Sequence, residues 1–243
     1  MFTLYKKEIK GFFSSLTGYI VVAVFLSVNG LFLWVFDNNF NILNSGYADL
    51  GSFFALAPWI FLFLVPAVTM RLFADEKKSG TIELLLTRPL SELSIVLAKY
   101  LAGLTLVIVS LIPTLLYFLS VYMLGMENAN IDTGGTWGSY IGLFFLAAVY
   151  VAIGLFASSL TENQIISFII GLIISLLFLI GFEELSALIS LPGLDSLLIN
   201  LGISEHYRSV SRGVIDTRDV LYFLSVIAIF ILFSKVKLES RKW

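Results

Sequence analysis

The chain offers few side chains of the kinds that build catalytic or metal-binding sites. It has no cysteine and a single histidine, His206. Disulfides, thiolate nucleophiles and sites made of several histidines are therefore excluded. The sequence contains neither a G-x-x-x-x-G-K-[ST] phosphate loop nor an H-E-x-x-H pair, so we expect no ATP hydrolysis and no metalloprotease chemistry from this chain. The chemistry that remains is recognition.

The polar residues that could recognise a partner gather in residues 71–99, RLFADEKKSGTIELLLTRPLSELSIVLAK. This stretch lies between two long apolar segments and holds five of the fifteen basic residues. We expect Ser79 and Gly80 to end one helix and Thr81 to cap a short second helix. Pro89 should stop that helix, because the residue before a proline is pushed out of the helical region. Ser91 should then cap the helix that leads into the third span.

The short expected helix, residues 82–87, is almost wholly apolar. Only Glu83 and Thr87 interrupt its aliphatic side chains, which are Ile82, Leu84, Leu85 and Leu86. Such a helix is not stable when exposed to water. It must pack on its own protein, on lipid, or in the groove of a partner.

Composition identifies an integral membrane protein. Apolar residues make up 58% of the 243 residues and charged residues 13%, whereas a soluble domain has about half and a quarter. We expect an all-α fold in a single domain, with an interfacial helix at 1–16 that carries aromatic and lysine side chains on different faces. The alternative for this segment is a basic flank that orients the first span. Six spans are predicted, at about 18–36, 53–70, 100–124, 138–160, 165–182 and 220–234.

Orientation follows from the basic residues. If both termini are cytoplasmic, twelve of the fifteen Lys and Arg residues lie inside, as the positive-inside rule requires. The other three share the outer segment 183–219, where short amphipathic or re-entrant helices are expected before the last span. Asp216 is the expected N-cap of that span, and Asp219 suits the positive end of its helix.

The predicted span interiors contain no Asp, Glu, Lys, Arg or His. This disfavours a proton-driven carrier or an intramembrane hydrolase, because such proteins keep ionisable groups at membrane depth. Ser167, Gly171 and Ser175 form a small-residue face on the fifth span. Such a face permits close helix packing, either within the chain or across a dimer interface.

The run EKKSGTIELLLTRPLSELSIVLAKYLAGL resembles the cytoplasmic loop of ABC-2 type transporter permeases. The family pattern E-x-x-x-G-T-[IL]-E-x-L-L-x-x-P is matched by Glu76, Gly80, Thr81, Ile82, Glu83, Leu85, Leu86 and Pro89. The six spans and the long last outer segment extend the resemblance over most of the chain. Among the branches, the chain looks most like the permease of the gliding-motility (Gld-type) ABC transporter.

The resemblance implies a transporter subunit of the bacterial inner membrane rather than an enzyme. Two permease chains, alike or different, would face each other among lipids, each joined to a separate ABC ATPase subunit. ATP and magnesium would be held by that ATPase, so no cofactor and no nucleic acid is expected on this chain. The transported substrate is not implied. Two alternatives from other classes are a secondary carrier or channel and a membrane scaffold that moves no substrate.

The resemblance also assigns roles within the loop. The helix at 81–87 would be the coupling helix that sits in a groove of the ATPase. Groove contacts would come from Ile82, Leu84, Leu85 and Leu86, and polar rim contacts from Glu83 and Arg88. The complete docking segment would be Gly80, Thr81, Ile82, Glu83, Leu84, Leu85, Leu86, Thr87, Arg88 and Pro89.

Overall fold

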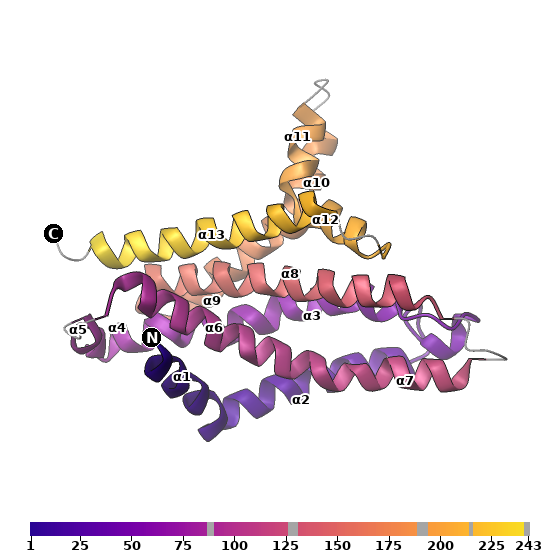
Figure 1. Ribbon diagram of the computed structural model, residues 1–243, viewed down its shortest axis with the longest axis horizontal. Helices are drawn as coiled ribbons and strands as arrows, with labels where there is room; N and C mark the ends of the chain where they lie inside the picture. Colours follow the sequence, from indigo (N-terminus) through magenta and orange to yellow (C-terminus); the bar gives the residue numbers. More distant parts are fainter. Residues whose placement is uncertain (87–89, 126–130, 189–193, 214–215, 241–243) are drawn as a thin grey trace.

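The computed structural model (Figure 1) describes residues 1–86, 90–125, 131–188, 194–213 and 216–240, with the side chains of 84–86 and 194 outside the description. These residues form helices and connecting turns without any strand, as the sequence predicts. The α-helices are α1 (Phe2–Ser14), α2 (Leu16–Gly30), α3 (Gly51–Thr69), α4 (Arg71–Lys78), α5 (Thr81–Leu86), α6 (Glu92–Leu111), α7 (Leu115–Leu124), α8 (Thr133–Leu160), α9 (Gln164–Leu176), α10 (Phe182–Leu188), α11 (Leu194–Leu201), α12 (Ile203–Val210) and α13 (Thr217–Glu239). Short π-helical turns are η1 (Leu31–Val35) and η4 (Leu177–Gly181), and 3-10 turns are η2 (Ile42–Asn44) and η3 (Ile112–Thr114).

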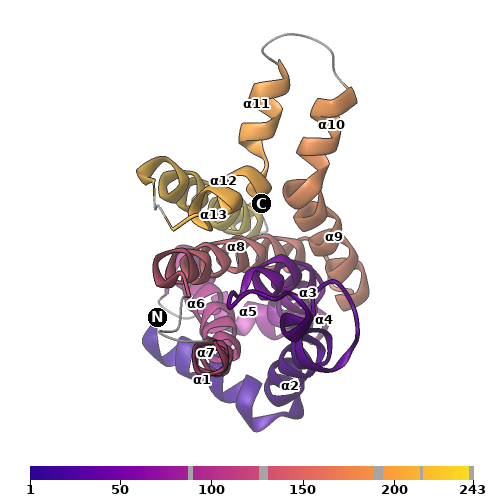
Figure 2. The same ribbon diagram turned by 90° about the vertical axis from the view of Figure 1, so that its right-hand side faces the viewer.

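The long helices run side by side along the longest axis of the molecule, with α8 in the middle (Figures 1 and 2). Helix α8 packs against α3, α6, α9 and α13 and is buried along most of its length. Its sequence explains this position, because small residues recur through it and let four neighbours approach closely. They include Gly138, Gly142, Ala147, Ala148, Ala152, Gly154, Ala157 and Ser158.

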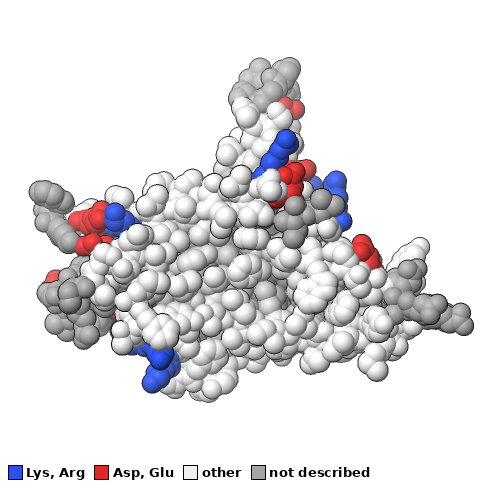
Figure 3. All heavy atoms as spheres, in the orientation of Figure 1, with Lys and Arg blue, Asp and Glu red and all other residues white. Residues whose placement is uncertain are grey.

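Six helical stretches of the described residues are long and apolar enough to cross a membrane, in agreement with the six predicted spans. They are Leu16–Val35, Gly51–Lys78, Glu92–Leu124, Thr133–Leu160, Gln164–Leu188 and Thr217–Glu239. Figure 3 shows charged side chains gathered near the two ends of the bundle, with an uncharged surface between them on this face. Such a band suits the hydrocarbon core of a bilayer.

The helices extend further than hydropathy predicts, because capping side chains set their ends. The third stretch starts at Glu92, eight residues before its predicted start, where Ser91 accepts a hydrogen bond from the Ser94 N–H. Asp132 caps α8 in the same way, and Asp216 caps α13 by accepting from the Arg218 N–H. The predicted caps at Ser91 and Asp216 are thus confirmed.

Two features stand outside the regular bundle. Helix α1 packs mainly on α6, with Leu4 and Phe12 buried and its lysines Lys6, Lys7 and Lys10 exposed. The segment before the last span forms three short helices, and α10 with α11 projects sideways as an arm (Figures 1 and 2). We call the two ends of the bundle the α5 end, which also holds α4 and the chain termini, and the α12 end.

Candidate functional site

A glycine turn separates α4 from α5 at the α5 end. Gly80 has a φ of +69°, in the left-handed region, and its N–H donates to the Lys77 carbonyl at 3.1 Å. The Ser79 hydroxyl donates to the Asp75 carbonyl at 2.7 Å. A Cβ on Gly80 would meet nothing within 4 Å, so the backbone conformation, rather than lack of space, requires glycine here.

Helix α5 presents different faces to the chain and to its surroundings. Ile82 is 2% exposed and packs in the chain's own core, whereas Thr81 and Glu83 are exposed. Ile82 therefore differs from the groove contact that the resemblance implies, because its side chain already has an apolar environment. The side chains of Leu84, Leu85 and Leu86 lie outside the described part of the structure, as do Thr87, Arg88 and Pro89.

Helix α4 is fastened to α8 through one serine. The chain breaks its helix at Met70, which leaves the N–H groups at the start of α4 without intrahelical acceptors. The Ser158 hydroxyl of α8 accepts from the Phe73 and Ala74 N–H groups at 2.9 and 3.1 Å and donates to the Met70 carbonyl at 2.7 Å. Next to it, the buried Lys77 ammonium donates to the Ser159 carbonyl.

A buried lysine ties α4 to two further helices. Lys99 of α6 has a side chain that is 1% exposed, and its Nζ lies 3.0 Å from Glu8 Oε1 of α1 and 2.9 Å from Glu76 Oε2 of α4. The same ammonium donates to the Leu72 carbonyl at 2.6 Å and lies 5.1 Å from the centre of the Phe73 ring. Lys7 Nζ, 3.3 Å from Glu76 Oε1, completes the set of charges. We call Lys7, Glu8, Glu76 and Lys99 the α4 charge cluster.

Within this cluster the buried Lys99 lies between Glu8 and Glu76, and the exposed Lys7 compensates the remaining negative charge. An unpaired charge away from water is very costly, whereas a paired and hydrogen-bonded one is tolerated. In the sequence alone, Lys99 is one of the cations of the loop and Glu76 is one of the motif residues. A signal was present, since Lys99 follows Ile95 and Val96 and precedes Ala102 and Gly103 on the buried stripe of α6.

Glu8 gives the matching signal on α1. It lies on the apolar stripe of that helix, between Leu4 and Tyr5 on one side and Ile9 and Phe12 on the other. Ionisable residues of opposite sign on the apolar stripes of two helices are expected to meet.

The small-residue face of α9 lies inside the chain. Ser167 and Ser175 are buried, and a Cβ on Gly171 would lie 3.4 Å from Pro66 of α3 and 3.5 Å from Gly154 of α8. This face therefore brings α9 onto α3 and α8.

At the α12 end, a proline creates the attachment point for α12. Pro58 has no N–H, so the carbonyl of Phe54 one turn earlier lacks its helical donor. The Tyr207 hydroxyl of α12 donates to this carbonyl at 2.7 Å. Burial raises the pKa of the Tyr207 phenol above its usual range, so the phenol keeps the proton that it donates.

Two further contacts hold α12 against α13 and α10. His206 Nδ1 lies 2.7 Å from Asp219 Oδ1, and the imidazole stacks on the Tyr222 ring with 3.8 Å between centres. A guanidinium nitrogen of Arg208 lies 2.8 Å from both carboxylate oxygens of Glu183. The start of α8 approaches the end of α12 very closely, because a Cβ on Gly138 would come within 2.7 Å of the Val210 carbonyl oxygen.

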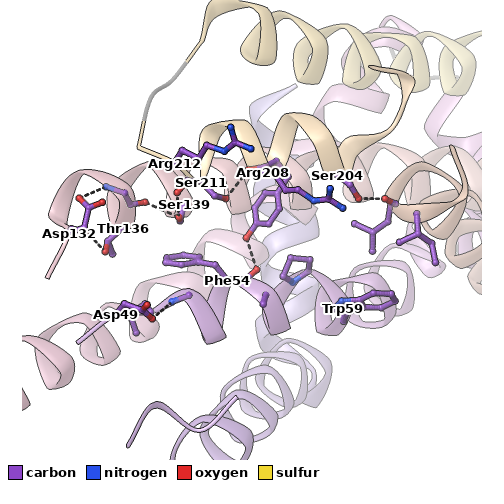
Figure 4. A pocket seen from close by; sticks show the side chains of 18 of the residues that line it. Asp49, Phe54, Trp59, Asp132, Thr136, Ser139, Ser204, Arg208, Ser211 and Arg212 are labelled. Carbon is purple, nitrogen blue, oxygen red and sulfur yellow. Dashed lines mark hydrogen bonds between the residues drawn. The ribbon is translucent and has the colours of Figure 1, made fainter. Parts of the chain in front are cut away.

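Between α3, α8, η4 and α12 these contacts leave a cavity of about 740 Å³. Figure 4 shows Asp49, Asp132 and Thr136 toward one end of it and Trp59 toward the other. Pro58, Leu179 and Ile180 also line it, so its wall is more apolar toward Trp59, although Ser204 and the Arg208–Glu183 pair lie on that side too. No sequence motif marked this cavity.

The fold defines a class of protein, a polytopic helical membrane protein. Its α5 end holds the α4 charge cluster, and its α12 end holds the cavity. The family model of the ABC-2 family transporter proteins matches residues 3–242, and the chain belongs to this family. No curated protein matches the chain.

Membership makes the chain a multi-pass membrane component of ABC transport. Such components work in general with an ABC ATPase subunit and typically carry no ATPase site of their own. The predicted resemblance to ABC-2 permeases is thereby confirmed at the level of the family.

Proposed function

We propose that this chain is the membrane-spanning permease subunit of an ATP-driven exporter and that α5 is its coupling helix. The bracing of α4 supports this proposal. A short helix that receives a push from another protein must be joined to the membrane helices by a stiff connection, and α4 is that connection. It is held by Ser158 of α8, by Lys99 of α6 and, through the charge cluster, by α1.

In this mechanism ATP binding closes a pair of ATPase subunits and displaces α5. The chain then acts as a two-state element that a ligand on another subunit biases. Ile82 anchors α5 to the chain's own core, and the exposed Glu83 contacts the rim of the ATPase groove. Leu84, Leu85, Leu86 and Arg88 complete the docking surface, a role that the family resemblance supports.

The proposal includes the cellular setting. The chain sits in the bacterial cytoplasmic membrane with both termini and α5 inside, and a second permease chain, alike or related, completes the transporter. The match of residues 76–89 to the ABC-2 pattern, together with the likeness of the whole chain to the Gld-type branch, supports a role in gliding motility.

The first test is co-purification from the native membrane. Wild type is compared with Leu85→Asp/Leu86→Asp, which places two charges on α5 and leaves every span unchanged. We expect a nucleotide-binding ATPase to accompany wild type and to be lost from the variant, because a buried charge opposes docking in an apolar groove. A matched control is Leu197→Asp/Leu201→Asp on α11, where both leucines are exposed, and it should retain the ATPase.

The outcome separates the proposed function from its alternatives. If a well-folded wild-type chain brings down no ATPase, the permease proposal fails, and a secondary carrier or channel, or a membrane scaffold, becomes the better hypothesis. If the ATPase is retained by the α5 variant and lost from the α11 control, the coupling contact lies elsewhere.

Orientation can be tested separately, since the chain has no cysteine. Two variants, Tyr47→Cys near the α12 end and Lys78→Cys at the α5 end, are treated with a membrane-impermeant maleimide; both native residues are exposed. We expect Tyr47→Cys to react in intact cells and Lys78→Cys to react only after the membrane is opened. The reverse pattern would contradict the proposed topology.

A further inference from the structure

The cavity at the α12 end has the dimensions of a ligand site. Its volume of about 740 Å³ falls within the range of about 300–1,000 Å³ that is usual for small-molecule pockets. Its residues come from helices that are far apart in sequence, including α3, α8 and α12, so the cavity depends on the tertiary fold.

The two ends of the cavity differ in polarity. The start of α8 supplies Asp132, Thr136 and Ser139, which lie at one end (Figure 4). Along α3, Trp59 comes eight residues after Gly51, which places it about 12 Å further along the helix axis. Pro58, Trp59 and Ile180 add apolar surface toward the other end of the cavity, where Ser204 also lies (Figure 4). A ligand that fills both parts must be amphipathic.

The charges at the polar end are not equivalent. Asp49 accepts from the Gly51 N–H at 2.8 Å, and Asp132 accepts from the Gly135 N–H at 2.9 Å, so both carboxylates are partly compensated by helix starts. Arg208 lines the cavity on the side of η4 and is paired there with Glu183. Arg212, by contrast, has no ion-pair partner among the described residues and lines the same cavity. One guanidinium is therefore available to an anion.

The hydroxyl groups at this end are already used as hydrogen-bond donors. Those of Thr136, Ser139 and Ser211 each donate their hydrogen to a backbone carbonyl, at 2.7, 2.8 and 2.8 Å. Their oxygens, like the carboxylates beside them, present lone pairs to the cavity. The polar end thus offers one cationic donor, Arg212, and several acceptors, of which Asp49 and Asp132 are carboxylates. It is complementary to a head group whose anion lies at Arg212 and whose hydroxyls donate to the carboxylate and hydroxyl oxygens.

We propose that this cavity binds a single-chain amphiphile whose head combines a phosphate with hydroxyl groups, a phosphoglycerol head being the simplest example. The phosphate lies against Arg212, the hydroxyls donate to the oxygens at the start of α8, and the hydrocarbon chain extends past Pro58 and Trp59. This site is separate from the coupling contact at α5. Its test contains no ATPase and does not depend on the proposed function.

The experiment uses the full chain in phosphatidylcholine nanodiscs. Trp59 is made the only tryptophan by Trp34→Phe, Trp137→Phe and Trp243→Phe. Lysophosphatidylglycerol with a brominated chain is titrated, and quenching of Trp59 fluorescence is measured. A brominated monoacylglycerol of equal chain length serves as the ligand without phosphate, and glycerol phosphate serves as the competitor without a chain.

We expect the phosphoglycerol amphiphile to quench at a concentration at least tenfold lower than the monoacylglycerol. Arg212→Gln should remove this difference, whereas Arg218→Gln, an exposed arginine outside the cavity lining, should preserve it. Ala55→Phe, which fills the cavity from α3, should weaken both amphiphiles by at least tenfold. Gel filtration checks the fold, and Arg212→Gln alone carries the test if Ala55→Phe does not fold.

Three results would overturn the proposal. Equal quenching by the two amphiphiles would show that the phosphate is not recognised. Full competition by glycerol phosphate would show that the chain is not needed and that the site takes a free anion. Quenching that is the same in wild type, Arg212→Gln and a folded Ala55→Phe would show partition into the bilayer alone.

Discussion

At each end of the bundle a short helix, α4 or α12, is held against the long helices, but the contacts that hold it differ. At the α5 end, charges from three helices meet around the buried Lys99. At the α12 end, α12 is held by the Tyr207 hydrogen bond, the buried His206–Asp219 contact and the half-exposed Arg208–Glu183 pair, around a cavity of about 740 Å³. A buried ion cluster resists separation, because each partner left alone would be an uncompensated charge. The comparison suggests a rigid end that transmits force and a looser end that accommodates a ligand.

The largest effect is expected from removing the central cation of the rigid end. Lys99→Met leaves Glu8 and Glu76 without their main partner, and loss of one member of a buried pair costs about 3–5 kcal/mol. Denaturant unfolding in detergent micelles, followed by the exposure of tryptophan, measures the change.

Its matched control is Lys7→Met, at a lysine whose side chain is 66% exposed. Exposed ion pairs are worth only about 0–1 kcal/mol, so this variant should unfold close to wild type. A second check is Lys99→Met/Glu8→Gln/Glu76→Gln, which removes the uncompensated charges and should recover part of the stability. Equal stability of Lys99→Met and wild type would show that the cluster does not brace α4.

An intermediate effect is expected where Tyr207 meets the Phe54 carbonyl. Tyr207→Phe leaves that buried carbonyl without a donor, at a cost of about 1–3 kcal/mol. Pro58→Ala supplies a backbone N–H one turn along and satisfies the carbonyl within α3. In the Pro58→Ala background, Tyr207→Phe should therefore cost little.

A double-mutant cycle on Tyr207 and Pro58 measures this dependence. Tyr222→Phe is the control, because the Tyr222 hydroxyl also donates to a backbone carbonyl, that of Leu201, but at an exposed position. If Tyr207→Phe costs the same with proline and with alanine at position 58, the proline does not create the attachment point.

The smallest effect is expected at the Arg208–Glu183 pair. Both side chains are substantially exposed, by 55% and 42%, so Glu183→Gln should change stability by no more than about 1 kcal/mol. Salt should reduce even this difference, whereas the loss in Lys99→Met should hardly depend on salt, since buried charges are poorly screened. Unfolding at low and high ionic strength compares the two ends directly. A salt-insensitive loss above that value in Glu183→Gln would show that the Arg208–Glu183 pair behaves as a buried pair rather than an exposed one.

Sequence reasoning reached the features that local patterns encode. Apolar runs gave the six spans, and side-chain chemistry gave the caps at Ser91 and Asp216 and the break at Gly80. It could not reach the α4 charge cluster, because Glu8, Glu76 and Lys99 meet only when α1, α4 and α6 pack together. By its position in the sequence, Lys99 belongs to the polar loop 71–99.

The cavity was hidden from sequence reasoning for a related reason. Its shape depends on where α12 rests on α3, and that position is set by the carbonyl that Pro58 leaves free. The proline was visible in the sequence and Tyr207 was visible in the outer segment. Nothing in the local pattern connects the two, which lie 149 positions apart.

The π-helical turn η4 makes the number of residues as important as their identity. In this turn the Phe182 N–H donates to the Leu177 carbonyl five residues earlier, so the turn holds one residue more than an α-helical turn. Because each α-helical residue turns the chain by about 100°, deleting Ile180 should rotate α10 and the arm by roughly a quarter of a circle. Nitroxide spin labels on Glu183→Cys and Arg208→Cys would report this rotation, because the distance between the labels should change after the deletion. The direction in which the arm projects then depends on the number of residues in η4. Among related sequences, this direction should change with insertions and deletions there more than with substitutions.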